Sequence, residues 1–195
     1  AARPPAVLTC DAASLILQLT AQCSNSSARI AAAARHRRDS LTSMPPAEII
    51  SGLYLGDRRD AKDRAALRRL NIQSIVNCTP PNSEDPGAGC PSFFERELRY
   101  LRVPIYDSPA EDAGEHFDAV LDFIASRLHY GGVLVHCNRG VSRSVTFVIA
   151  HLMKARGQDP ASALELVREV RPQAEPNKAF LKQLDALHTE LKASR

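Results

Sequence analysis

A short run near the middle of the chain combines a nucleophile, an anion-binding backbone and a fixed positive charge. The run is His136 to Ser144, with the sequence HCNRGVSRS. Backbone N–H groups and a nearby guanidinium stabilise a thiolate, so Cys137 is expected to have a strongly lowered pKa. Such a thiolate can attack phosphorus, which makes the run a candidate site for phosphoryl transfer.

The other side chains of the run suit the same chemistry. Arg143 lies six residues after Cys137, and its planar fork can hold two oxygens of a phosphoryl group. Gly140 allows a positive φ, so that successive N–H groups turn inward and form an anion-binding nest. Ser144 is expected to donate a hydrogen bond to the thiolate as it leaves phosphorus.

Hydrolysis also needs an acid that protonates the leaving oxygen. The candidate is Asp107, where a strand-like run ends in a loop flanked by Pro104 and Pro109. Glu111 and Asp112 are alternatives, although both are better interpreted as the acidic start of the next helix. Asp107 can also be a turn-capping residue without a role in catalysis.

The elements around the run place it where anions bind. The apolar, β-branched run 132–135 predicts a buried strand, and residues 144–154 predict a helix. The candidate loop therefore joins the end of a strand to the N-terminus of a helix, where unpaired N–H groups and the positive end of the helix dipole converge.

The rest of the chain alternates strands and helices. The expected strands are 49–55, 72–77, 98–105 and 133–135. The expected helices are 61–70, 117–128, a buried helix after Arg143, and a last helix from Lys178 to the end. A further helix is expected to begin at Asp159-Pro160 and to bury Leu164, Val167 and Val170. This pattern predicts an α/β fold, with a central, mainly parallel sheet flanked by helices on both faces and a phosphate-binding loop between the central strand and a buried helix.

Composition narrows the possible partners. The 195 residues are 44% hydrophobic, enough for one domain with a substantial core. The net charge is only +3 and no basic stripe with interleaved aromatic residues occurs, so nucleic acid is not an expected partner. The longest apolar stretch, near 145–150, is far too short to span a membrane. Five cysteines without a tight framework favour a reducing compartment, the cytosol or the nucleus.

The run 136–144 resembles the signature of cysteine-based protein tyrosine phosphatases, and its SRS ending resembles the dual-specificity branch. Further similar motifs are ISGLYLGD at 50–57, IVNCT at 75–79, Asp107, IAHLM at 149–153, VRP at 170–172 and PN at 176–177. The resemblance implies that Cys137 is the nucleophile, Asp107 the general acid and Ser144 an assisting hydroxyl. It implies phosphate binding by Asn138, Arg139, Gly140, Val141, Ser142 and Arg143.

The same resemblance implies a two-step reaction through a phosphocysteine, with no metal and no other cofactor. The expected partner is a phosphorylated protein that carries phosphotyrosine or phosphoserine and phosphothreonine, and a kinase is one candidate. A phosphoinositide or RNA phosphatase shares this loop chemistry and remains an alternative. A phospho-dependent binding module and a rhodanese-type sulfur transferase are further alternatives, although the first would normally lose Cys137 or Arg143 and the second has no use for Asp107.

The chain departs from the family pattern in three ways. Residues 80–90 form a longer loop than expected, rich in proline, glycine and acidic residues, and this insertion is expected to border the pocket. Arg139 adds a second cation where many relatives carry a small residue. No rhodanese-like targeting domain is recognisable, which favours an atypical, single-domain member of the family.

The predicted domains are an N-terminal extension, partly helical or flexible, over 1–45 and a dual-specificity phosphatase catalytic domain over 46–195. The extension contains a basic cluster, 35–38, which can be a docking motif or a solvated face, and Ser40, a possible phosphorylation site. Cys78 ends a strand predicted to lie beside the central one. A reversible disulfide between Cys78 and Cys137 is therefore a hypothesis.

Overall fold

The computed structural model describes residues 45–194, which contain one five-stranded mixed sheet. The strands are β1 (Ala47–Ile50), β2 (Leu53–Gly56), β3 (Ile72–Asn77), β4 (Arg99–Arg102) and β5 (Gly132–His136). Within this part of the chain the order is β1-β2-β5-β3-β4, and only the β1–β2 pair is antiparallel. The predicted mainly parallel sheet, with the strand before Cys137 at its centre, is confirmed.

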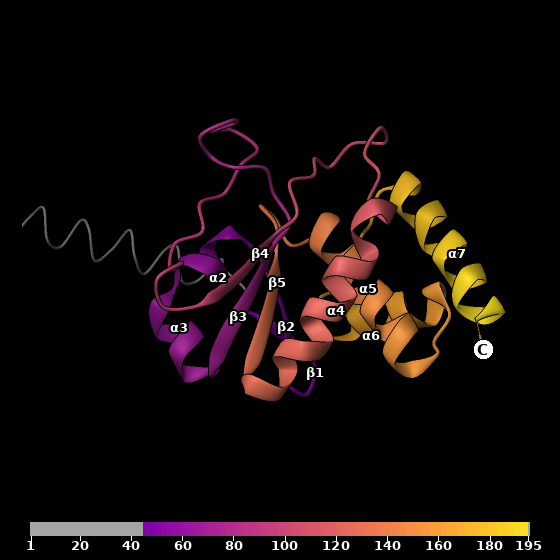
Figure 1. Cartoon of the computed structure of the whole chain (residues 1–195), viewed down its shortest axis with the longest axis horizontal. Coiled ribbons are helices and arrows are strands. Elements are labelled where there is room, and N and C mark those ends of the chain that lie inside the picture. The colour runs from indigo at the N-terminus through magenta and orange to yellow at the C-terminus, as the bar shows by residue number, and fades with distance from the viewer. Residues whose placement is uncertain (1–44, 195) are drawn as a thin grey trace, which may run out of the picture. The chain divides into compact units, whose positions relative to one another are not determined.

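Helices cover both faces of this sheet (Figure 1). The α-helices are α2 (Arg58–Lys62), α3 (Arg64–Arg69), α4 (Phe117–Arg127), α5 (Arg143–Arg156), α6 (Pro160–Val170) and α7 (Lys178–Ala193). Two 3-10 turns, η1 (Gly114–His116) and η2 (Leu128–Tyr130), flank α4. Helices α2 and α3 lie on one face and the other four on the opposite face, so the predicted α/β fold is confirmed.

Two predicted elements near the start of the sheet are wrong in detail. The single strand predicted over 49–55 is a hairpin of β1 and β2, because Gly52 adopts a φ of 80° and reverses the chain. The single helix predicted over 61–70 is divided into α2 and α3. Asp63 leaves the helical region with a ψ of 88°, and its carboxylate accepts hydrogen bonds from the N–H groups of Ala65 and Ala66. A short aspartate side chain thus begins a new helix where periodicity suggested a continuous one.

The strand predicted over 98–105 is also shorter, since β4 ends at Arg102. From Val103 onward the chain leaves the sheet and runs as an irregular segment toward Asp107. The N–H of Val103 still donates to the carbonyl of Asn77 at 2.9 Å, which carries the chain past the end of β3. The strand therefore ends three residues earlier than predicted and leaves Asp107 in a loop.

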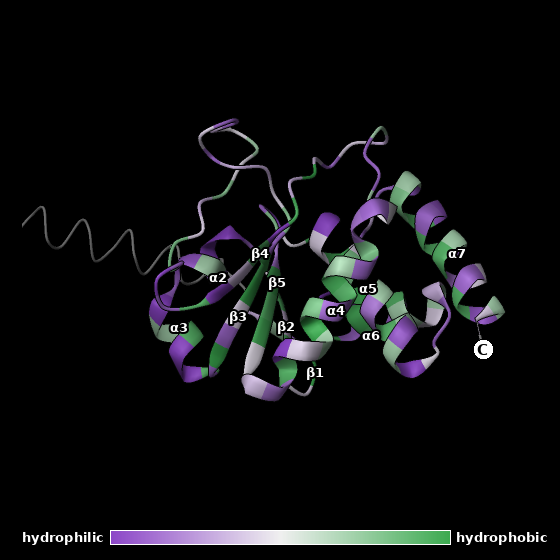
Figure 2. Ribbon diagram, in the orientation of Figure 1, coloured by the Kyte–Doolittle hydropathy of each residue, from purple (hydrophilic) through white to green (hydrophobic). Residues whose placement is uncertain are grey.

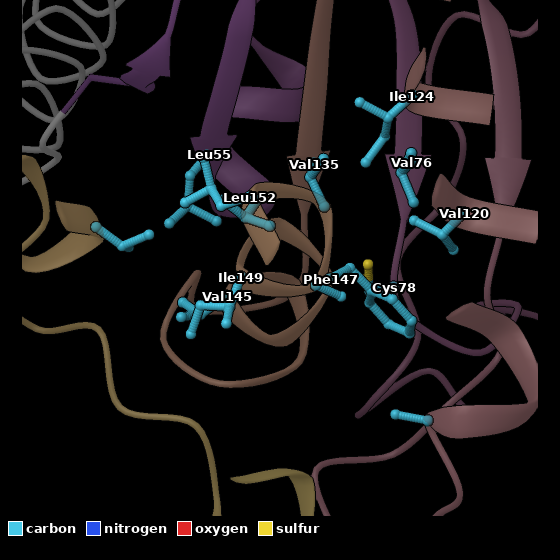
Figure 3. Packing of buried hydrophobic residues seen from close by; sticks show 14 of the residues in the cluster. Leu55, Val76, Cys78, Val120, Ile124, Val135, Val145, Phe147, Ile149 and Leu152 are labelled. Carbon is cyan, nitrogen blue, oxygen red and sulfur yellow. The ribbon is translucent and has the colours of Figure 1, made fainter. Parts of the chain in front are cut away.

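Buried apolar residues form a cluster on each side of the sheet, and Figure 2 shows hydrophobic residues along the strands and on the helices that pack against them. The larger cluster lies between the sheet and α4–α7, and Figure 3 shows side chains from β2, β3, β5, α4 and α5 meeting there. A smaller cluster lies under α2 and α3 and contains Tyr54, Leu67 and Ile75. Helix α6 buries Leu164 and Val167 as predicted, but Val170 is 42% exposed because α6 ends there.

Helix α5 is buried along most of its length, as predicted, from Arg143 to Met153. Its burial matters for the site because the loop before it is held between the central strand and this helix, both inside the core. Among residues 45–194, no helix is long and apolar enough to cross a lipid bilayer. The predicted N-terminal extension, including the basic cluster 35–38 and Ser40, lies outside the described residues.

Candidate active site

The loop between β5 and α5 curls around the sulfur of Cys137. The backbone N–H of Gly140 donates a hydrogen bond to Sγ at 3.2 Å, and the hydroxyl of Ser144 approaches Sγ at 3.3 Å. Cys137 is only 2% exposed, so its side chain is almost completely buried. The structure thus brings the predicted nucleophile and the predicted assisting hydroxyl into contact.

The surroundings of Cys137 favour its anion. Burial by itself raises the pKa of this thiol, but the Arg143 guanidinium, the Ser144 hydroxyl, and the backbone N–H groups of Ser144 and Arg139 all lower it, and the net shift of the pKa is downward. A sulfur with a lowered pKa is a stronger candidate nucleophile than an ordinary buried cysteine, because more of it is thiolate at neutral pH.

Gly140 has a left-handed φ of 64°, as the predicted nest requires. A Cβ atom at this position would collide with the carbonyl of Gly56 and with the guanidinium of Arg171. Arg171 is fully buried beneath the loop, and its Nε donates to the carbonyl of Gly140 at 2.8 Å. Only glycine fits between these two neighbours, so the curled shape of the loop depends on it.

Arg143 begins α5 and is 6% exposed. One terminal nitrogen of its guanidinium donates to the carbonyl of Ile105 at 3.1 Å, which fixes the plane of the group. Its Nε is buried and has no hydrogen-bond partner among the described residues. A buried N–H without a partner is costly, so a bound anion with two acceptor oxygens would satisfy it.

The start of α5 also remains open to an anion. Ser142 occupies the N-cap position, but its side chain makes no capping bond to the helix. Its hydroxyl instead donates to Asp107 Oδ1 at 2.6 Å and accepts from the backbone N–H of Asn177 at 3.1 Å. The first N–H groups of α5 are therefore not satisfied by the side chain that would normally cap them.

Asp107 lies against the loop, as predicted, on an exposed segment after β4. Besides Ser142, its Oδ1 accepts from the side-chain Nδ2 of Asn177 at 3.1 Å. The other side-chain atom of Asn177, Oδ1, caps α7 by accepting from the N–H groups of Ala179 and Phe180. One asparagine thus begins a helix and orients the candidate acid.

The two alternative acids are placed elsewhere. Asp112 accepts a hydrogen bond from the N–H of Gly114 at 2.8 Å, just before η1. The carbonyl of Glu111 accepts from the side chain of Gln183 on α7 at 2.9 Å. Within residues 45–194 neither carboxylate is hydrogen-bonded to the loop 137–143, whereas Asp107 is.

The remaining predicted phosphate-binding residues differ in environment. Arg139 is exposed, and its carbonyl accepts from Arg171 at 3.3 Å. The carbonyl of Val141 accepts from the N–H of Glu175 at 2.8 Å. Asn138 turns its side chain away from the loop and donates to the carbonyl of Ala88 at 2.6 Å. The insertion 80–90 therefore contacts the loop, as predicted.

His136 precedes the nucleophile and is completely buried. Burial lowers the pKa of its imidazole to about 4, against a small opposing effect of a hydrogen bond with the carbonyl of Cys137, so the ring is neutral. Its Nδ1 lies 3.4 Å from that carbonyl, and its Nε2 has no partner among the described residues. A neutral ring here leaves Arg143 as the buried cation next to the sulfur.

Three contributions to the site were not assigned from the sequence. Arg171 and Asn177 lie in the similar motifs at 170–172 and 176–177 without a predicted role of their own, and the Ile105 carbonyl is a backbone group that carries no sequence signal. The asparagine that precedes the predicted last helix was a capping signal, which identifies one of its two roles. Residues 45–194 contain no group of three or more His, Cys, Asp or Glu side chains placed to hold a metal ion.

Comparison with known proteins agrees with this geometry. The chain matches the family described as dual specificity phosphatase, catalytic domain, over residues 53–190. It is 41% identical over 148 residues to human dual specificity protein phosphatase 26, a match that covers 74% of this chain and 68% of that protein. It is 37% identical over 151 residues to dual specificity protein phosphatase Mpk3 of Drosophila melanogaster, covering 75% of this chain but only 35% of that protein.

Solved structures give the same result. The crystal structure of human DUSP28 matches with a TM-score of 0.67 and 32% identity, covering 77% of this chain and 97% of that one. The crystal structure of DUSP15 matches with a TM-score of 0.66 and 32% identity, over 77% and 97% of the two chains. These matches confirm the resemblance predicted from residues 136–144 and the motifs around them.

Proposed function

Because this chain belongs to the dual specificity phosphatase family, whose members are cysteine-based protein phosphatases, we propose that it hydrolyses phosphotyrosine and phosphoserine or phosphothreonine in proteins through a phosphocysteine intermediate. One observation carries the proposal. The sulfur of Cys137 has a lowered pKa and accepts hydrogen bonds from Gly140 and Ser144, while the adjacent Arg143 keeps a buried, unpartnered Nε.

In the first step the substrate phosphate binds in the loop 137–143. Backbone N–H groups and the Arg143 guanidinium hold its oxygens, and they stabilise the charge that builds up as the phosphoryl group is transferred. The Cys137 thiolate attacks phosphorus, and the bond from phosphorus to the substrate oxygen breaks. Asp107 donates its proton to that oxygen, so the protein leaves as a neutral alcohol or phenol.

In the second step water attacks the phosphocysteine. The Asp107 carboxylate takes a proton from the water, and the bond from sulfur to phosphorus breaks. Ser144 donates its hydroxyl hydrogen bond to the sulfur as this regains its negative charge. Inorganic phosphate is released and the thiolate is restored.

The thiolate chemistry of Cys137 also indicates the class of substrate and the cellular compartment that we propose. The substrate is a phosphorylated protein, and a phosphorylated kinase is one candidate. A thiolate nucleophile is lost on oxidation, so the enzyme is expected to work in the cytosol or the nucleus, where thiols stay reduced.

A substrate panel tests the function. Wild type and Cys137→Ser are assayed on phosphotyrosine, phosphothreonine and phosphoserine peptides, on phosphoinositide vesicles and on RNA with a 5′ phosphate. Cys137→Ser should lose turnover and still bind phosphopeptides, whereas Cys90→Ser, a second buried cysteine, should remain active. Faster turnover of the lipid or the RNA than of every peptide would overturn the proposal. Binding of phosphopeptides by wild type without any turnover would support a binding module instead.

A further inference from the structure

The insertion 80–90 is a loop whose two ends, the base of the loop, are held together by hydrogen bonds. The hydroxyl of Thr79 accepts from the N–H of Cys90 at 3.0 Å and donates to Asn77 Oδ1 at 2.7 Å. The Nδ2 of Asn77 in turn donates to the carbonyl of Cys90 at 3.0 Å. These buried contacts bring the two ends of the loop together directly after β3, so the loop projects from the carboxyl-end edge of the sheet as one unit.

Arg102, the last residue of β4, also donates hydrogen bonds to the base of the loop. Its NH1 lies 3.1 Å from the carbonyls of Thr79 and Pro80 and 3.0 Å from that of Cys90. Its NH2 donates to the hydroxyl of Ser92 at 2.8 Å. One guanidinium therefore joins the start of the insertion to its end, and its planar, multiply hydrogen-bonded geometry makes it a rigid clamp.

The insertion is also joined to the phosphate-binding loop. Asn138, the residue next to the nucleophile, donates its side-chain Nδ2 to the carbonyl of Ala88 at 2.6 Å. The carbonyl of the same Asn138 accepts from the N–H of Arg58 at 3.4 Å. The insertion thus has a fixed place on one side of Cys137.

The segment that carries Asp107 also borders the phosphate-binding loop. That segment is held by the bond from Ser142 to Asp107 and by the bond from Arg143 to the Ile105 carbonyl. Figure 1 shows both segments rising beyond the carboxyl ends of the strands, the one after β3 and the one after β4. A phosphorylated side chain that enters between these segments would reach Cys137, a residue that is only 2% exposed.

We propose that the insertion 80–90, positioned by Arg102 and joined to Asn138, is a fixed wall of the substrate cleft that makes this enzyme prefer phosphotyrosine to phosphothreonine and phosphoserine. The inference rests on the proposed function. The phosphate of phosphotyrosine stands one aromatic ring farther from the peptide backbone than that of phosphoserine, so it reaches the recessed Cys137 while the backbone stays outside. A phosphothreonine residue would have to bring its peptide backbone between the insertion and the segment that carries Asp107, both of which are held in place by hydrogen bonds.

Two variants release the wall without substituting any residue of the phosphate-binding loop, although one of them, the deletion, also removes the Ala88 carbonyl to which Asn138 donates. Arg102→Met keeps the length of the side chain and removes its hydrogen bonds. Deletion of residues 82–88 shortens the wall, and it is compatible with the fold because Gly89 lies directly against Pro81. Arg99→Met is the matched control, since Arg99 is an exposed residue of β4 that makes no hydrogen bond from its side chain to a described residue.

The readout is kcat/KM on a phosphotyrosine and a phosphothreonine peptide with identical flanking residues, with p-nitrophenyl phosphate as a small substrate that does not need the wall. Wild type is expected to favour phosphotyrosine by about tenfold or more, and both wall variants should reduce that ratio at least about fivefold. The kcat on the small substrate should stay within about twofold of wild type, and Arg99→Met should leave the ratio unchanged.

The outcomes separate the two proposals. Wild-type turnover of both peptides, with a ratio that stays the same in both folded wall variants, would overturn the wall and leave the proposed function intact. A wild type that hydrolyses neither peptide would overturn the proposed function itself. If Arg102→Met unfolds, the deletion variant decides the question, because it retains the Arg102 clamp at the base of the loop.

Discussion

The hydroxyl of Ser142 donates a hydrogen bond to the carboxylate of Asp107 at 2.6 Å, across 35 positions of the chain. The same hydroxyl accepts from the backbone N–H of Asn177. The loop after β4, the N-cap of α5 and the N-cap of α7 therefore meet at one oxygen atom. This contact sets the position of the candidate acid relative to the phosphate-binding loop, which a loop residue by itself cannot do.

Replacement of Asp107 should affect leaving groups unequally. Asp107→Asn keeps the hydrogen bond from Ser142 but cannot donate a proton. We expect kcat to fall about a hundredfold for a phenyl phosphate with a basic leaving group, and much less for one whose phenolate leaves readily, because general acid catalysis matters most for poor leaving groups. Steady-state kinetics over a series of substituted phenyl phosphates measures the dependence.

Asp112→Asn is the matched control, since Asp112 belongs to the turn before η1 and is not bonded to the loop. It should leave the dependence on the leaving group unchanged. Equal slowing of all substrates by Asp107→Asn would remove Asp107 from the acid role and leave it as an anchor of Ser142.

Removal of the Ser144 hydroxyl should weaken the thiolate. Ser144→Ala deletes the side-chain hydrogen bond that helps to lower the pKa of Cys137, so the pKa should rise toward that of an ordinary thiol. The pH dependence of alkylation by iodoacetamide reports this directly. We also expect kcat to fall about tenfold, through slower breakdown of the phosphocysteine, whose leaving group is the thiolate.

A burst of product equal to the enzyme concentration should accompany the lower kcat of Ser144→Ala, because the second step becomes limiting. An unchanged alkylation profile in the folded variant would show that Arg143 and the backbone N–H groups stabilise the thiolate without the hydroxyl.

The local geometry of the loop was predictable from the sequence, and the contacts that support the loop were not. Cys137, Arg143 and Ser144 lie within one strand-turn-helix unit, where spacing determines geometry. The contact of Asn138 with Ala88 bridges 50 positions, and no periodicity encodes it. Arg171 resembled an ordinary charged residue at a helix end, although it is fully buried beneath Gly140.

The errors in the fold have a common cause. Apolar periodicity located the sheet and the large helices correctly, because these elements each bury a continuous face. It did not locate the turn at Gly52 or the break at Asp63, where one backbone angle or one carboxylate overrides a short apolar pattern. Side-chain capping and positive φ act over two or three residues, below the length at which periodicity is informative.

Asp60 should make the protein less stable as the pH rises. Burial raises the pKa of its carboxyl to about 7 from an ordinary 3.8, so the folded state binds more protons than the unfolded state between these values. Stability from this group is present below pH 4 and lost as the pH rises through 7. Asp60→Asn retains an oxygen for the N–H of Asp57 and should raise the free energy of unfolding at pH 8 by roughly 2 kcal/mol.

Urea unfolding at several pH values measures this effect. The gain from Asp60→Asn should shrink as the pH falls toward 4, because the wild-type carboxyl is then protonated in the folded state and begins to be protonated in the unfolded state. A gain of the same size at pH 4.5 and pH 8 would mean that the substitution acts through packing or helix capping instead.

His136 should make the protein less stable as the pH falls, the opposite of the effect of Asp60. Burial lowers the pKa of its imidazole to about 4 from an ordinary 6.5, so the unfolded state binds the extra proton between these values. The stability that the neutral His136 contributes is present above pH 6.5 and is lost as the pH falls through 4. In total it amounts to a free energy of unfolding on the order of 3 kcal/mol. In wild type this slope opposes that of Asp60 between pH 4 and 6.5.

The two single variants should therefore have stability profiles of opposite slope in that range. Asp60→Asn should lose stability steeply on acidification, and His136→Gln should not. If both variants keep the wild-type profile, neither group controls the pH dependence.

Mild oxidation should join Cys78 to Cys137. The register of β3 and β5 pairs Asn77 with His136, and the N–H of Cys78 continues that pairing with a 2.8 Å bond to the His136 carbonyl. Cys78 therefore lies beside Cys137 at the ends of adjacent strands, about 4.8 Å apart in the backbone, which suits a disulfide. Both side chains belong to the same apolar cluster, in which Figure 3 labels Cys78.

Hydrogen peroxide is the oxidant that allows this disulfide to form. The Cys137 thiolate takes an oxygen from peroxide and becomes a sulfenic acid, with release of hydroxide. Burial raises the pKa of Cys78 well above its ordinary value, so this partner stays a thiol until it reacts. Its sulfur then attacks the sulfenic sulfur, the S–S bond forms, and the thiol proton leaves with the hydroxyl as water.

Peptide mapping after one equivalent of peroxide should recover a peptide that links residues 78 and 137, and dithiothreitol should restore activity. Cys78→Ser should instead accumulate sulfinic acid at Cys137 and lose activity irreversibly, because no thiol traps the sulfenic acid. Cys90→Ser is the control, since Cys90 is also buried and free and carries a raised pKa. A link from Cys137 to Cys90, or reversible inactivation that persists in Cys78→Ser, would assign the resolving thiol to the insertion rather than to β3.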